Sequence, residues 1–119
     1  MSPQPPRVKL VFLHPFDELA AHEARDRGYL SYVSVELEDG SRYPVVFYDP
    51  VRLRQDLEEV TKLGHPCVAD PGMIVIPEVT MEHMSKAIAI LAEEGFFSDL
   101  QRIRSTTALE PARTFRWPP

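Results

Sequence analysis

The sequence has a single cysteine, no long apolar run and no excess of basic residues, and each of these absences excludes a class of protein. One cysteine, Cys67, allows no internal disulfide and fits the reducing cytosol. No apolar run approaches the roughly 20 residues that a membrane-spanning helix needs. The first nine residues, MSPQPPRVK, lack the apolar stretch of a secretory signal. We therefore expect a cytoplasmic protein that does not associate with membranes.

The balance of charge argues against a nucleic-acid partner. The chain carries 13 Lys and Arg against 18 Asp and Glu, a formal net charge of −5, whereas phosphate backbones are bound by basic surfaces. The sequence also has no glycine-rich phosphate loop and no dinucleotide-binding fingerprint. We expect no nucleic-acid partner and no cofactor.

The stretch from Tyr29 to Asp49 has the alternation of a β-hairpin. Apolar and polar residues alternate with period two in both arms, as in strands with one buried face. A two-residue loop at Asp39-Gly40 would mix the two faces, whereas a three-residue loop, 38–40, places Gly40 where such loops need a left-handed residue. The longer loop puts the apolar residues on one face, and it predicts the pairs Val35–Tyr43, Val33–Val45 and Glu36–Arg42.

The second face of this hairpin is only partly polar. The alternation assigns Tyr29 to the core face, and it gathers four residues on the other face at the end away from the turn: Leu30, Tyr32, Val46 and Tyr48. Such a patch needs a cover, which would be the N-terminal segment, the C-terminal tail or another subunit. We therefore name Tyr32 and Tyr48 as candidate partner-binding residues. Pro44 cannot donate a ladder hydrogen bond, which favours an edge position for its strand.

Further elements are expected on either side of the hairpin. A strand over 8–13 and a helix over 16–27 precede it. After it, Asp49 and Pro50 have the residue types of a helix start, and Gly64 ends that helix. A strand over 73–76 follows, and then a last helix from the cap at Thr80 to Gly95.

These elements predict an α/β or α+β fold, in which a small mixed sheet of three or four strands carries two main helices packed on one face. The core order is ββαβα, preceded by a βα segment. A right-handed crossover makes the 73–76 strand parallel to the second hairpin arm. With Pro44 at an edge, that strand would pair with the first arm. We expect residues 1–7 to be disordered, 8–98 to form one domain and 99–119 to be an extended tail.

The helix after the hairpin is expected to bury one side. Leu53, Leu57 and Val60 recur at helical spacing and are assigned to the core. The other side offers three ion pairs at i,i+4 spacing: Arg52–Asp56, Arg54–Glu58 and Glu58–Lys62. The rest of the core is expected from the strands and the last helix: Val33, Val35, Leu37, Val45, Phe47, Ile74, Ile76, Met84, Ile88 and Leu91.

The loop over 65–72 holds the residue types of a possible catalytic site. His65, Cys67 and Asp70 lie close in sequence, and a His beside a Cys stabilises the reactive thiolate. The spacing matches no motif that fixes their geometry. Free cysteines are also among the most buried residues, so we favour Cys67 as a small apolar residue at the entry to the next strand.

A second group has the residue types of a metal site. His14, Glu18 and His22 stand near one end of the expected first helix, with Asp26 one turn further on. Zinc sites use three or four convergent ligands in which imidazole or thiolate is well represented. A solvated helix face has the same composition, so we expect no metal here.

The C-terminal 21 residues differ in charge from the rest. They hold four arginines against Asp99 and Glu110, a net charge of +2, which leaves −7 on residues 1–98. Phe115, Arg116 and Trp117 are of the types enriched at interface hot spots. This tail either recognises a partner or covers the second face of the domain's own sheet.

Two classes of function are compatible with these patterns. We favour a non-catalytic cytosolic interaction or accessory protein, which binds a protein partner or itself as a homodimer through the second hairpin face or the tail. It is favoured because the sequence has no catalytic set. The alternative is a small enzyme or ligand-binding protein with its site at 65–72. That loop precedes a strand, whereas ligands in α/β sheets usually sit beyond the carboxyl ends of strands.

Overall fold

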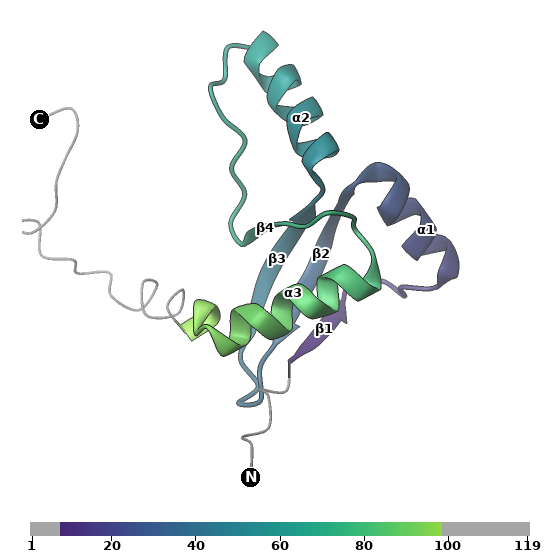
Figure 1. Ribbon diagram of the computed structural model, residues 1–119, viewed down its shortest axis with the longest axis vertical. Coiled ribbons are helices and arrows are strands. Elements are labelled where there is room, and N and C mark those ends of the chain that lie inside the picture. Colours follow the sequence, from purple (N-terminus) through teal and green to yellow (C-terminus); the bar gives the residue numbers. More distant parts are fainter. Residues whose placement is uncertain (1–7, 99–119) are drawn as a thin grey trace, which may run out of the picture.

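The computed structural model describes residues 8–98, which form a mixed four-stranded sheet with helices (Figure 1). The expected order of elements is confirmed, and so is the α+β class. The elements are β1 (Lys9–Phe12), α1 (Glu18–Arg27), β2 (Tyr29–Glu36), β3 (Arg42–Tyr48), α2 (Pro50–Lys62), β4 (Met73–Val75) and α3 (Met81–Glu93). Residues 1–7 and 99–119 lie outside the described part, and with them the expectations of a disordered start and an extended tail.

The register of the β2–β3 hairpin is confirmed. Val35 pairs with Tyr43, Val33 with Val45 and Glu36 with Arg42. The loop has three residues because the Leu37 N–H donates to the Ser41 carbonyl at 2.9 Å, and Gly40 closes it at a φ of 86°. A residue with a side chain is disfavoured at that φ, so Gly40 sets the loop length and hence the register.

One extra residue in β2 changes the expected faces at the other end of the hairpin. Leu30 pairs with Phe47 and Val33 with Val45, so two residues of β2, Ser31 and Tyr32, stand opposite one residue of β3. This β-bulge reverses the alternation beyond it. The assignment of Tyr29 to the core face was therefore wrong, and Leu30 takes its place there.

The expected strand order was also wrong. The sheet runs β1-β2-β3-β4, so β4 pairs with β3 and not with β2. The expected parallel orientation of β4 to β3 is confirmed. Pro44 therefore lies in an inner strand. It is tolerated there because β4 pairs only with the last three residues of β3, from Val46 onward, and needs no hydrogen bond from position 44. The Val46 N–H donates to the Gly72 carbonyl at 3.1 Å. Since alternate residues of a strand point the same way, the Pro44 nitrogen faces the same side, beyond the end of β4.

Gly72 permits this close approach of the chain to β3. A Cβ atom at position 72 would collide with the Pro44 carbonyl oxygen, and the φ of 72° is itself unfavourable for other residues. The loop can therefore enter β4 directly beside the proline.

The hydrophobic core lies between one face of the sheet and the helices α1 and α3. Most of the expected core residues of β2, β3, β4 and α3 are buried, while Leu37 and Leu91 are half-buried against them. Phe97, just after α3, was not expected in the core, yet only 1% of its surface is exposed. Its ring lies 5.6 Å from that of Tyr43. Among residues 8–98, the buried hydrophobic residues are Ala24, Val33, Val35, Tyr43, Val45, Phe47, Tyr48, Ile74, Ile76, Val79, Met84, Ile88 and Phe97.

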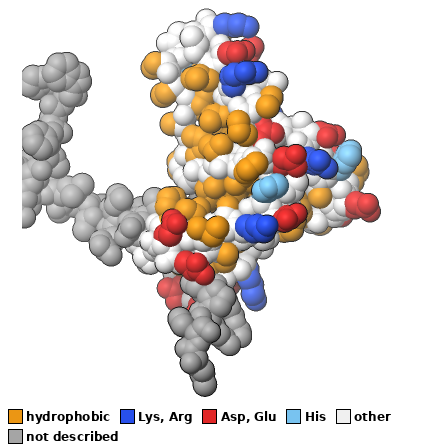
Figure 2. Space-filling view, in the orientation of Figure 1, with side chains coloured by type: hydrophobic (Ala, Val, Ile, Leu, Met, Phe, Trp, Pro, Cys, Tyr) orange, Lys and Arg blue, Asp and Glu red, His pale blue; other side chains and the backbone are white. Residues whose placement is uncertain are grey.

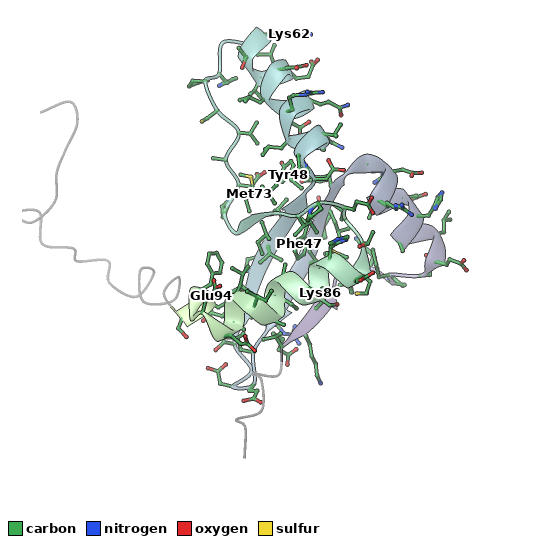
Figure 3. All side chains as sticks on the ribbon, viewed as in Figure 1. Phe47, Tyr48, Lys62, Met73, Lys86 and Glu94 are labelled. Carbon is green, nitrogen blue, oxygen red and sulfur yellow. The ribbon has the colours of Figure 1, made fainter. Side chains whose placement is uncertain are left out.

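Helix α2 does not join this core. It stands off the end of the sheet, with Lys62 at its far tip, and the chain returns beside it to β4 (Figures 1 and 3). None of its residues is buried, so the assignment of Leu53, Leu57 and Val60 to the core was wrong. The sheet face that they were expected to cover is occupied by α1, α3 and Phe97.

Replacing Phe97 with alanine should lower the free energy of unfolding by about 3–5 kcal/mol, because it leaves a cavity in the core beside Tyr43. Urea denaturation followed by circular dichroism measures the change. Ile90→Ala in α3, where the side chain is 53% exposed, is the matched control and should cost about 1 kcal/mol or less. Equal effects of the two substitutions would show that Phe97 is not part of the core.

Candidate functional site

Tyr32 is the most unusual residue of the described chain. It is the only residue other than glycine among 8–98 with a positive φ, at 59°. Its side chain is 70% exposed, and its ring meets the edge of the His14 ring with 6.2 Å between centroids. The Tyr32 carbonyl accepts a hydrogen bond of 3.0 Å from the Leu13 N–H, which fixes the bulge against the end of β1. The backbone of Tyr32 is therefore strained, and in this conformation it holds the aromatic ring at the surface.

Tyr32 borders the sheet face that α1 and α3 leave free. Cross-strand pairs share a face, so Val11 lies with Ser34 and Pro44 on the side opposite the core. These residues form a shallow hollow with Leu13, Tyr32 and Val46. Leu13 is 70% exposed, so the hollow carries an apolar side chain beside an aromatic one. Leu13 and Val11 were not named as site residues, although the apolar run over 8–13 has apolar residues on both faces.

A second depression lies on the other side of Tyr32, toward α1. Phe12 and Phe16 form part of its wall, with parallel rings 4.4 Å apart. Its charged groups, Glu23 and Arg27, form an ion pair of 3.6 Å with each other. The depression therefore presents mainly apolar surface, and Tyr32 stands at the border of both hollows.

Tyr48 lies at a different place and is buried. Only 4% of its surface is exposed, and its hydroxyl donates a 2.7 Å hydrogen bond to the Asp70 carboxylate. The Tyr29 ring packs edge-on against it at 5.0 Å, and the Arg52 guanidinium lies over Tyr29. The bulge separates Tyr48 from Tyr32, so the two candidate partner-binding residues do not form one exposed patch.

The pKa of the Tyr48 phenol is raised well above its ordinary value of 10.0. Burial is the main cause, because it disfavours the charged phenolate, and the hydrogen bond to Asp70 adds to it. Asp70 is therefore an acceptor that ties the 65–72 loop to β3, rather than a free acid or base.

The other residues of this loop are exposed. Cys67 and His65 both face solvent, and no hydrogen bond joins them within the described part of the chain. The expectation of Cys67 as a buried strand-entry residue was wrong, because β4 begins only at Met73. Of the three candidate catalytic residues, only Asp70 contacts another functional group, the hydroxyl of Tyr48.

The candidate metal ligands are not brought together. His14 lies against Tyr32, whereas His22 pairs with Asp26 at 3.5 Å on the exposed side of α1. Among residues 8–98, no three His, Cys, Asp or Glu side chains converge in a way that could hold an ion. Phe115, Arg116 and Trp117, the candidates in the tail, lie outside the described residues.

Comparison with known proteins finds no matching family model, no matching curated protein and no matching solved structure. Within the described residues, none of the helices is long and apolar enough to span a membrane.

Replacing Tyr32 with glycine should raise the free energy of unfolding by about 0.5–1 kcal/mol, because glycine relieves the left-handed strain while the exposed ring adds little packing. Thermal and urea denaturation measure the change. Ser34→Gly in the same strand has no such strain to relieve and should be destabilising by about 0.5–1 kcal/mol. A Tyr32→Gly variant as unstable as Ser34→Gly would show that the Tyr32 ring contributes to folding.

The raised pKa of Tyr48 predicts a loss of stability in alkali. The folded state holds the phenol proton more tightly than the unfolded state, so this stabilisation is complete below pH 10 and is lost as the pH rises toward the native pKa. The difference in free energy of unfolding between wild type and Tyr48→Phe should be constant up to about pH 10 and fall by about 1.4 kcal/mol per pH unit above it. Urea unfolding between pH 7 and 11 tests this, and a constant difference over that range would contradict it.

Proposed function

We propose that this chain is a non-catalytic interaction or accessory protein that binds a protein partner through its free sheet face around Tyr32. The observation that carries the proposal is the strained and exposed position of Tyr32 itself. A non-glycine residue in the left-handed region costs on the order of 1–3 kcal/mol. The ring recovers little of that cost, since it is 70% exposed and, among residues 8–98, its one aromatic contact is with His14. Bulges that redirect a side chain are common beside functional sites.

The chemistry of this face suits a protein partner. Tyr32 and Leu13 provide a half-aromatic, half-aliphatic centre, and tyrosine is a residue type enriched at interface hot spots. Charged residues lie toward the turn of the hairpin, where Arg42 and Glu36 form an ion pair of 3.6 Å. An apolar centre beside exposed charged groups resembles the core and rim of transient interfaces.

The tail is the second recognition element of this proposal. Phe115, Arg116 and Trp117 add aromatic and basic groups to an otherwise acidic chain. We place the protein in the cytoplasm, because a single cysteine is typical of chains made for a reducing compartment.

The test compares full-length variants that differ in one exposed side chain. Leu13→Asp and Tyr32→Ser alter the free sheet face, and Leu19→Asp is the control, because Leu19 is 66% exposed on α1. In a pull-down from cell lysate, a protein that binds to immobilised wild type and to Leu19→Asp should no longer bind to either sheet-face variant. With that protein purified, calorimetry should show at least a tenfold weaker affinity, or about 1.4 kcal/mol.

Retention of the same proteins by all variants would overturn the proposal. If Phe115→Ala/Trp117→Ala alone abolishes the interaction, recognition belongs to the tail and the sheet face is not the binding surface. Circular dichroism of each variant confirms that the fold is intact.

A further inference from the structure

Helix α2 has an apolar stripe that its own domain covers only in part, since Leu53 and Val60 are half-buried. Both α2 and α3 have 13 residues and an apolar side, but α3 buries Met84 and Ile88 whereas α2 buries none of its residues. Leu57 is 42% exposed at the middle of the stripe, and Leu63 at its end is 76% exposed. Figure 2 shows hydrophobic side chains gathered along this projection and the loop beside it.

A helix in this position needs a partner surface. Isolated helices shorter than about 12–15 residues are marginal in water, and most helical stability comes from packing of an apolar side. The side-chain hydrogen bonds that tie α2 to its own cap and to α1 lie at its start. There Asp49 accepts a 2.7 Å hydrogen bond from the Arg52 N–H, and the Arg52 side chain donates to the Arg27 carbonyl at 3.2 Å. The far half of the helix has no comparable attachment to the sheet within residues 8–98.

The charges along α2 indicate what covers it. The first half carries Arg52, Arg54 and Asp56, a net charge of +1, and the second half carries Glu58, Glu59 and Lys62, a net charge of −1. The i,i+4 pairs expected between Arg54 and Glu58 and between Glu58 and Lys62 do not form. Lys62 pairs with Glu59 at 3.5 Å instead. Arg54 and Glu58 therefore form no ion pair within the described residues. Only the expected pair of Arg52 with Asp56 is present, at 2.9 Å.

We propose that α2 packs antiparallel against α2 of a second copy, about a twofold axis near Leu57, so that the chain is a homodimer. In this arrangement Leu57 meets Leu57 of the partner copy, and Leu53 meets Val60. The basic half of each helix lies against the acidic half of the other, so Arg54 reaches Glu58 of the partner copy on both sides of the axis. A twofold interface requires such self-complementarity, because the same surface is used by both copies.

The interface is small, which sets the concentration range for its test. A 13-residue helix is about 20 Å long. Two such helices bury less than the roughly 800 Å² per partner of a standard interface. We therefore expect a reversible dimer with a dissociation constant on the order of micromolar.

Sedimentation equilibrium of the full-length chain from about 1 to 200 µM tests the proposal, a range set around that expected constant. Wild type should shift from the mass of one chain toward that of two. Leu57→Glu places two carboxylates at the axis and should remain monomeric throughout. Leu19→Glu, at an exposed leucine of α1, is the control and should dimerise as wild type does.

A charge exchange tests the antiparallel pairing itself. Arg54→Glu leaves two acidic groups at these positions, and Glu58→Arg leaves two basic ones, so each variant alone should dimerise at least tenfold more weakly. An equimolar mixture of the two should regain the wild-type affinity, because each helix then faces its opposite. An ion pair within one helix could not produce this rescue.

Three results would overturn the proposal. If the wild type stays monomeric up to the highest concentration, α2 does not pair with α2 of a second copy. A monomeric wild type that dimerises once Phe115→Ala/Trp117→Ala is introduced shows that the tail covers the helix. A Leu57→Glu variant that still dimerises assigns the contact to another surface. The interface does not include Tyr32 or Leu13, so this inference and the proposed partner site can fail independently.

Discussion

An extra residue in β2 reverses the alternation of that strand, while Tyr43, Val45 and Phe47 of β3 all keep facing the core. Toward the turn, Val33 and Val35 pair with residues of β3 whose side chains enter the core. Beyond the bulge the alternation reverses, so Leu30 packs toward α1 while Tyr29 and Tyr48 share the other side. Tyr48 follows Phe47 on β3 and points to that other side, where its hydrogen bond to Asp70 anchors the loop that leads to β4. The bulge also sets Tyr32 at the surface, which links the fold to the proposed partner site.

The distribution of burial is uneven across the molecule. One side of the sheet is closed by α1, α3 and Phe97, whereas the opposite side and α2 retain exposed apolar groups such as Leu13 and Leu57. Scattered exposed leucines are ordinary in soluble proteins. Here Leu13 lies in a hollow next to Tyr32, and Leu57 lies on the apolar stripe of α2. Exposed apolar residues that are grouped in this way are expected of contact surfaces.

The sequence was sufficient for the features that depend on local chemistry. Gly40 determined the loop and with it the hairpin register, and Asp49 and Thr80 correctly marked the starts of α2 and α3, because a side chain at a cap bonds a backbone N–H only three residues away. The bulge was not predictable from alternation, since one inserted residue leaves the period unchanged on each side. The predicted strand order was wrong because we assumed that Pro44 requires an edge strand. A β4 of only three residues leaves the β4-facing side of Pro44 without a ladder partner, so β3 can be an inner strand.

The candidate sites were predicted less well than the fold because they depend on contacts between distant segments. The pairing of Tyr48 with Asp70 spans 22 residues, and no local pattern predicts it. The apolar stripe of α2 was correctly predicted but wrongly assigned to the core. An amphipathic pattern indicates that a helix packs against some surface, but it does not identify that surface. Phe97 was overlooked because it follows the glycine that ends the α3 pattern.

The position of Phe97 has a consequence for how the chain is made. Synthesis proceeds from the amino end, and the ring that completes the core comes at the carboxyl end of the domain, after every strand has been translated. Until that residue emerges, Tyr43 and the adjoining side of α3 lack a closing contact. A chain that ended before Phe97 would therefore display an open apolar surface of the kind that chaperones and proteases act on.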